Sequence, residues 1–158
     1  MLWKEGIKVD VKTFSQDHID AWVEEGGMWA AGISRGSMAT PESWAKLKHL
    51  QGTSSLTWLA IGDFNEIIGL TEKEGGRTRP RRQMENFIDA INHCGFRDIG
   101  FIGLKYTWLY QKLDGTQIWE RLDRALATKE WMDLFTMAKL YHLSSSASDH
   151  SPLSLHWV

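Results

Sequence analysis

Three short polar clusters each follow or interrupt an apolar stretch of the chain, and each holds residue types that can bind a metal ion or move a proton. The first is Gly62-Asp63-Phe64-Asn65-Glu66, where a carboxylate and an amide stand two residues apart. Asp63 could hold a divalent cation or take a proton from water, and Asn65 could hydrogen-bond a phosphate or the attacking water. The alternative is an Asx turn that caps a strand, since short motifs have many accidental matches.

The second cluster is Glu120-Arg121-Leu122-Asp123-Arg124, within an expected strand. Residues two apart in a strand point to the same side, so Arg121 and Asp123 should share one face. On its own this cluster indicates a surface ion pair more readily than a functional site.

The third cluster is Ser148-Asp149-His150-Ser151. Histidine is the side chain best suited to acid or base work near neutral pH, and a carboxylate bonded to its ring fixes the tautomer. Neighbouring residues of an extended chain point to opposite sides, so Asp149 is poorly placed to orient His150. Asp123 is therefore the candidate partner.

A polar loop between residues 72 and 82 carries four closely spaced arginines, Arg77, Arg79, Arg81 and Arg82. They could bind phosphates, with each contact adding salt-dependent affinity. They could equally form a solvated loop balanced by Glu72, Glu74 and Glu85. The sequence leaves both interpretations open.

The elements that must position these clusters are mostly short strands. Alternating apolar residues predict two strands within residues 2–23, separated by a polar turn at 15–17, and a third at 28–33. Helices are predicted from Pro41 to about Gly52 and, by apolar residues at helical spacing, from about Met84 to Gly95. Further strands are predicted at 56–61, 99–102, 106–110, 117–126, 137–143 and 153–158, with a short helix over 128–135 capped by Thr128.

Composition bounds the class of protein. The 158 residues, 42% hydrophobic and 24% charged, suit one globular domain, and no apolar run approaches the length of a membrane span. One cysteine, Cys94, and the lack of a signal-peptide pattern indicate an intracellular protein, nuclear or cytoplasmic rather than secreted. A net charge of −2 means that any nucleic-acid surface must be local.

The order of the motifs carries more information than any one of them. Gly-Asp-Phe-Asn, then Tyr106-Thr107-Trp108, then Arg121-Leu122-Asp123, then Ser148-Asp149-His150 resembles the endonuclease/exonuclease/phosphatase superfamily, the group of deoxyribonuclease I. Residues 56–155 look closer still to the endonuclease domain of plant LINE-type (non-LTR) retrotransposons, whereas residues 1–55 match only loosely. The segments behind this closer likeness read WLAIGDFNEI, EKEGGR, GFIGLKYTW, ERLDRAL and SDHSPL.

The resemblance implies an α/β fold of the α+β type: a partial four-layer α/β sandwich, deoxyribonuclease I-like, with two packed, mainly antiparallel sheets flanked by helices. It implies Mg²⁺- or Mn²⁺-dependent cleavage of DNA. Asp63 would align or deprotonate water near the metal, Asn65 would hold that water or a phosphate oxygen, and Asp149 would help bind the ion. His150 would contact the scissile phosphate, oriented by Asp123. Thr107 would lie on the strand that family members place against the DNA backbone. The loop arginines Arg77, Arg79, Arg81 and Arg82 are candidate DNA contacts because of their charge, not because of the resemblance.

The chain also departs from the family pattern. The family's first strands, which carry an asparagine and the glutamate that is the principal Mg²⁺ ligand, have no counterpart in residues 1–158, and no tyrosine occurs before Tyr106. We therefore expect a domain without its N-terminal strands that binds Mg²⁺ weakly and cuts DNA weakly or not at all. An uncovered flank of one sheet would then be open to self-association.

Two other functions fit the same residues. A non-catalytic nucleic-acid or protein-binding module could keep the fold for its surface. A phosphatase of small phosphoesters is a weaker alternative, because the superfamily includes such enzymes but the retroelement-like segments argue against it.

Overall fold

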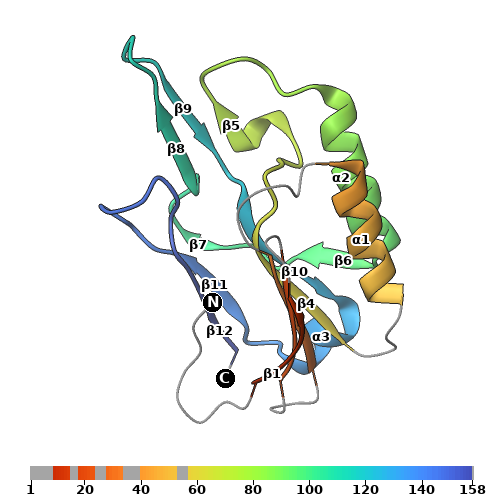
Figure 1. Ribbon diagram of the computed structural model, residues 1–158. Coiled ribbons are helices and arrows are strands. Elements are labelled where there is room, and N and C mark those ends of the chain that lie inside the picture. Colours follow the sequence, from red (N-terminus) through yellow and green to blue (C-terminus); the bar gives the residue numbers. More distant parts are fainter. Residues whose placement is uncertain (1–8, 15–17, 24–27, 34–39, 53–56, 158) are drawn as a thin grey trace.

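The computed structural model describes residues 9–14, 18–23, 28–33, 40–52 and 57–157. The largest of the described sheets has six strands and is seen nearly edge-on in Figure 1. Its strands pair antiparallel except β3 with β4, which run parallel and are joined through a helix. Such a pair needs a crossover connection, which the helix supplies. In spatial order the strands are β1 (Val9–Phe14), β2 (His18–Val23), β3 (Met28–Ile33), β4 (Trp58–Asp63), β10 (Asp123–Thr128) and β6 (Phe96–Asp98).

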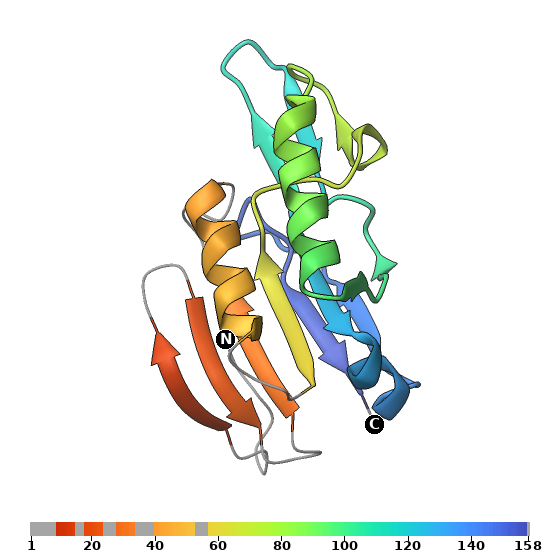
Figure 2. The same cartoon turned by 90° about the vertical axis from the view of Figure 1, so that its right-hand side faces the viewer.

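Two helices, α1 (Pro41–Gly52) and α2 (Arg81–His93), cover one face of this sheet (Figure 2). Trp58 of β4 is fully buried under them, and the ring of Trp44 stacks on that of Phe87 with centroids 4.7 Å apart. Cys94, just after α2, is 1% exposed in the same core. The helical spacing of apolar residues in the sequence thus corresponds to the buried face of α2.

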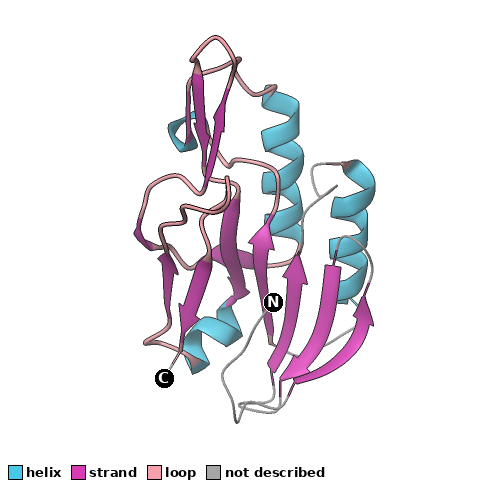
Figure 3. Ribbon diagram, turned by 60° about the vertical axis from the view of Figure 1, so that its left-hand side comes forward, coloured by secondary structure: helices cyan, strands magenta, loops and turns pink. Residues whose placement is uncertain are grey.

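The opposite face packs against a three-stranded sheet of β12 (Leu153–His156), β11 (Lys139–His142) and β7 (Ile102–Gly103), in that order. Side chains alternate along β4, so Leu59 and Ile61 enter this second core with Leu140 and Trp131, the latter from α3 (Lys129–Leu134). The expected α/β sandwich of two mainly antiparallel sheets is confirmed (Figure 3). Among the described strands, β12 pairs with β11 alone.

A third, small sheet consists of β5 (Lys73–Glu74), β9 (Gln117–Glu120) and β8 (Trp108–Gln111), in that order. Strands β8 and β9 form a hairpin that projects beyond the other sheets (Figure 1), and β5 follows the short helix η1 (Leu70–Glu72). The single strand predicted over 117–126 is wrong, because the chain leaves this sheet at Glu120 and enters the large sheet at Asp123. Arg121 and Asp123 consequently do not share a strand face, since the two residues between the strands turn the chain.

Other elements follow the sequence prediction closely, with two corrections. The strand expected at 99–102 is wrong: β6 ends at Asp98 and β7 begins at Ile102, because Gly100 at φ +76° turns the chain between them while its N–H donates to Asp98. Thr128 does precede α3, but its hydroxyl accepts the N–H of Trp58 rather than capping that helix. Residues 2–8, the turn at 15–17 and Leu56 lie outside the described residues.

No helix in the described part of the chain has the length and apolar character needed to cross a membrane.

Candidate functional site

Asp63 is the last residue of β4, and the backbone turns sharply just beyond it. Its Oδ1 accepts the N–H of Asn65 at 2.8 Å, and Asn65 adopts the left-handed conformation with φ +53°. Phe64 between them is fully buried and donates its backbone N–H to the carbonyl of Leu122. The Asx turn considered from the sequence is therefore present, and it fixes the Asp63 carboxylate and the backbone of Asn65.

Asp123 opens β10 and lies directly opposite Asp63 in the antiparallel β4–β10 pair. Its backbone N–H and that of Leu122 both donate to the hydroxyl of Thr107, at 2.9 and 3.0 Å. Thr107 is 1% exposed, and the DNA contact expected of its strand stays a prediction. The hydroxyl accepts both of these hydrogen bonds inside the protein and so stabilises the turn between the small and large sheets.

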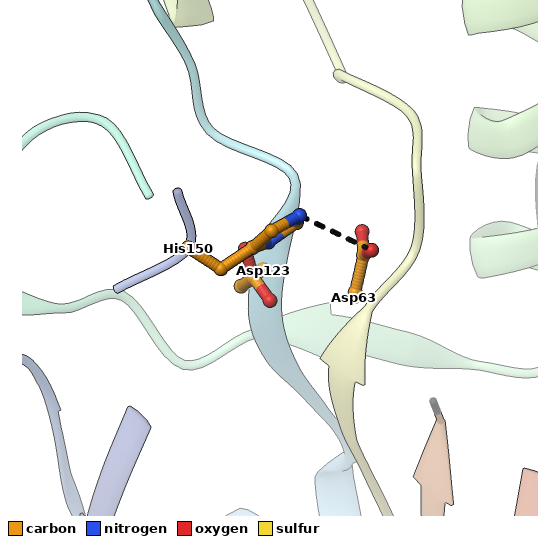
Figure 4. Close-up of side chains that lie close together, drawn as sticks. All are labelled: Asp63, Asp123 and His150. Carbon is orange, nitrogen blue, oxygen red and sulfur yellow. Dashed lines mark hydrogen bonds and ion pairs between the residues drawn. The ribbon is translucent and has the colours of Figure 1, made fainter. Parts of the chain in front are cut away.

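His150 lies in the loop between β11 and β12, over the ends of β4 and β10 (Figure 4). Its Nδ1 donates to Oδ2 of Asp123 at 2.9 Å, and its Nε2 is 3.8 Å from Oδ2 of Asp63. The hydrogen bond with Asp123 raises the pKa of His150 above its ordinary value against the opposing effect of partial burial, with further help from the charges of Asp123, Asp63 and Asp149. The orienting role proposed for Asp123 from the sequence matches this geometry.

Asp149 is exposed and takes a different direction from His150, as alternation in an extended chain requires. Its Oδ2 accepts the indole N–H of Trp108 at 3.2 Å, and its carbonyl accepts the N–H of Leu109 at 3.0 Å. Asp149 is thus held at the rim, beside the start of β8, while the inner cluster consists of Asp63, Asp123 and His150.

Beneath the site lies a network of two arginines and two carboxylates. The guanidinium of Arg124, fully buried, contacts Glu72 at 2.7 Å and Asp98 at 3.0 Å. Arg121 contacts the same two carboxylates at 2.9 Å each. Burial alone would raise the pKa of Glu72 and of Asp98, but the hydrogen bonds and charges of the arginines outweigh it and lower both.

The four arginines between residues 77 and 82 differ in exposure: Arg79 is partly buried, whereas the other three are exposed. Arg79 turns inward, where its Nη2 donates to Oε2 of Glu120 at 2.6 Å and its Nε lies 3.8 Å from Oε1 of the fully buried Glu66. Lys73 pairs with Glu120 as well. Arg79 therefore joins the Asp63 loop to the end of β9, with its side chain 23% exposed, and the phosphate contact expected of it stays a prediction.

The other three arginines of the loop are exposed. Arg81, in the first turn of α2, pairs with Glu85 at 2.7 Å, one of the balancing carboxylates expected from the sequence. Arg77 and Arg82 are exposed on either side of it. Glu72, also expected to balance this loop, instead belongs to the buried network below the site.

The sequence analysis missed the buried network because it interpreted Arg121 as half of a surface ion pair with Asp123 and assigned no role to Arg124. One signal was available: Arg124 is followed by the apolar run Ala125-Leu126-Ala127, where a charge is unlikely to remain exposed. Its partner Asp98 could not be identified this way, because the strand around it was placed several residues too late.

The inner cluster has the donor types of a divalent metal site. One ligand atom from each of Asp63, Asp123 and His150 lies within 4.8 Å of the others, and no second such group of three was found in the described residues. A positioned histidine between two carboxylates can also hold a proton near a phosphate oxygen. The chemistry that this arrangement supports is hydrolysis of an anionic ester.

Comparisons with solved structures identify proteins whose fold is similar to that of this chain. No protein-family model matches the chain, and no curated protein matches it by sequence. Among solved structures, it is similar to the endonuclease domain of TRAS1, a telomere-specific non-LTR retrotransposon, with TM-score 0.68 and 12% identity over 99% of this chain and 71% of that one.

Two further solved structures show the same architecture. The 3′ phosphatase NExo from Neisseria, bound to product DNA hairpin, matches with TM-score 0.65 and 14% identity over 98% of this chain and 71% of that chain. AP endonuclease LMAP from Leishmania major matches with TM-score 0.64 and 13% identity over 88% of this chain and 54% of that chain. The fold is that of the endonuclease/exonuclease/phosphatase proteins, and the likeness to a retrotransposon endonuclease domain is confirmed at the level of structure.

Proposed function

We propose that this chain is a metal-dependent phosphodiesterase-like domain of retrotransposon origin that acts on DNA, with weak activity. The observation that carries the proposal is the contact of His150 with Asp123 at 2.9 Å, opposite Asp63, at the end of the large sheet. This arrangement brings together residues far apart in the sequence, at the ends of two neighbouring strands, and functional residues of sheet proteins are often carried by the loops at strand ends.

The roles of the chain's own residues follow from their positions. His150, held by Asp123, keeps a proton on Nδ1, which leaves Nε2, 3.8 Å from Oδ2 of Asp63, to contact a phosphate oxygen in the site. Asp63 is placed to align or deprotonate the attacking water. Asn65, two residues later, has its backbone held by the turn, and its side-chain amide would hold this water or a phosphate oxygen.

The donor set fits a divalent ion in part. Carboxylate oxygens are the ligands that Mg²⁺ prefers, and it commonly keeps several waters when only one or two carboxylates bind it. Asp63 and Asp149 would hold Mg²⁺ or Mn²⁺, with weak affinity because so few protein ligands are offered. When bound, the ion would neutralise charge that develops on the phosphate.

DNA is the proposed substrate for two reasons. The first is a group of exposed arginines in the segment that follows Asp63: Arg77 in the loop before α2, and Arg81 and Arg82 in its first turn. NExo, which shares the fold, is described in complex with a DNA hairpin, and TRAS1 as a retrotransposon endonuclease.

The second candidate is a nucleic-acid-binding module without catalysis. It is favoured by one observation: two carboxylates of the proposed site are already engaged, Asp123 with His150 and Asp149 with the indole of Trp108. Such a module would use the same exposed arginines without turning over substrate.

Conversion of supercoiled plasmid to the open-circular form separates the two. With Mg²⁺ and the purified chain, slow nicking that stops with excess EDTA and is lost in His150→Ala supports the phosphodiesterase. DNA binding in a mobility-shift assay without any nicking at high protein concentration supports the binding module instead. Absence of both overturns the nucleic-acid assignment.

A further inference from the structure

A pair of parallel aromatic rings extends from the site along β8. Trp108, the first residue of β8, forms a backbone bridge with His150, and the two ring centroids lie 6.4 Å apart. Tyr110 follows two residues later on the same face, with its ring 5.8 Å from that of Trp108 and an angle of only 5° between the planes. The three rings therefore follow one another in space, from His150 through Trp108 to the exposed Tyr110.

Trp108 is held firmly on several sides. Its indole N–H donates to Asp149, and its ring packs against the apolar cluster of Ile67, Met84 and Leu122. An aromatic ring fixed in this way loses little further freedom when a ligand binds. It thus supports Tyr110, whose side chain is 49% exposed.

Packing within the hairpin does not account for the exposed ring. The cross-strand partner of Tyr110 is Ile118 of β9, which is itself only half-buried. Burying Tyr110 would be favourable, yet it stays open at the border of a site suited to an anionic ester. Two exposed lysines, Lys105 and Lys112, stand before and after β8, where they suit a polyanion.

We propose that Tyr110, supported by Trp108, stacks against an unpaired base next to the phosphate bound at the site. The inference rests on the proposed function and deepens it, since it names single-stranded or locally unpaired nucleic acid as the substrate class. Every base has a flat face that an aromatic side chain can cover. In a duplex those faces are already stacked on neighbouring bases, so an exposed ring gains contact only where a base is unpaired.

Fluorescence anisotropy with labelled oligonucleotides, in EDTA to prevent cleavage, tests the proposal. The probes are oligothymidylate, an abasic oligomer of the same length, and a duplex. Tyr110→Ala should weaken binding of oligothymidylate by about 5- to 150-fold, whereas Tyr110→Phe should bind as the parent does. Binding of the abasic oligomer and of the duplex should not change. Leu113→Ala, at the fully exposed tip of the same hairpin, is the control.

The outcomes separate this inference from the proposed function. If the parent chain binds oligonucleotides and Tyr110→Ala binds oligothymidylate equally well, the stacking role is wrong and the function stands. Equal losses on the abasic oligomer also overturn stacking, since no base is present to stack. If the parent binds none of the three probes, the nucleic-acid function itself fails, and the inference fails with it.

Discussion

Asp63 and Asp123 are cross-strand partners at the open end of the β4–β10 pair, so that the site's two buried carboxylates face one another across a single backbone ladder. Their spacing is set by the register of two strands that are buried along most of their length. A slip of one residue would turn every side chain of a strand to the opposite face. The spacing of the two carboxylates is therefore set by the same packing that fixes the register of the buried strands.

Asp123→Asn should lower the pKa of His150, because the hydrogen bond to Asp123 is the main cause of its raised value. NMR titration of the imidazole in metal-free buffer measures this. Asp149→Asn is the control and should change the pKa of His150 less, since Asp149 acts on it only through its charge. A larger effect of Asp149→Asn than of Asp123→Asn would contradict the assigned geometry.

The raised pKa of His150 makes the free energy of unfolding depend on pH. Because the folded state binds the His150 proton more tightly, this group stabilises the fold fully below its ordinary pKa near 6.5 and loses that contribution as pH rises through the raised pKa. Urea unfolding between pH 5 and 9 should show this loss in the parent chain and a smaller one in His150→Gln. Identical profiles for the two proteins would exclude the linkage.

Mg²⁺ should bind weakly, since the site offers few carboxylates and the ion needs six ligands, most of them waters here. Titration calorimetry at neutral pH should give no saturation at micromolar Mg²⁺, and Asp63→Asn should remove the remaining signal. Micromolar or tighter affinity in the parent chain would mean that the ligand set has been underestimated.

Plasmid nicking should be slow and should fall by about 10²- to 10³-fold in His150→Ala, the usual cost of losing one positioned polar group. His156→Ala is a matched control, because His156 is an exposed histidine of β12 outside the site. Equal rates for His150→Ala and the parent would show that the nicking comes from elsewhere.

Arg124→Met should destabilise the fold by about 3–5 kcal/mol, because it leaves Glu72 and Asp98 with one arginine fewer below the site. Removing an exposed partner, as in Arg81→Met, should cost at most about 1 kcal/mol. Urea unfolding at neutral pH compares the two variants. Equal small losses would mean that the buried network contributes little.

Acid should weaken the parent chain through the same network. The pKa values of Glu72 and Asp98 are lowered in the folded state, so the unfolded chain takes up these protons first and stability falls as pH drops below about 5. In Arg124→Met the pKa of Glu72 should rise, and the fall in stability between pH 5 and 3 should be shallower. A steeper fall in that variant would contradict this account.

The order of the motifs in the sequence grouped Asp63, Asp123 and His150 into one candidate site, and the structure brings their side chains together. Asp63 follows an apolar strand pattern and could be placed at a strand end, whereas Asp123 was expected inside a strand, and the turn before it comes from tertiary packing. The buried ion pairs could not be located in the same way, because Arg124 finds its carboxylates 26 and 52 residues away and in elements whose bounds were uncertain. The direction of Arg79 and the burial of Thr107 depend equally on tertiary packing, which no local pattern records.

Cys94 gives the molecule an internal reporter of its own unfolding. It is the only cysteine in the sequence, it is 1% exposed, and burial raises its pKa to about 11. A thiol-specific reagent requires the thiolate and access to the sulfur. Labelling should therefore proceed only as fast as the core between α2 and the large sheet opens, so that the rate of modification measures the frequency of that opening without any added probe.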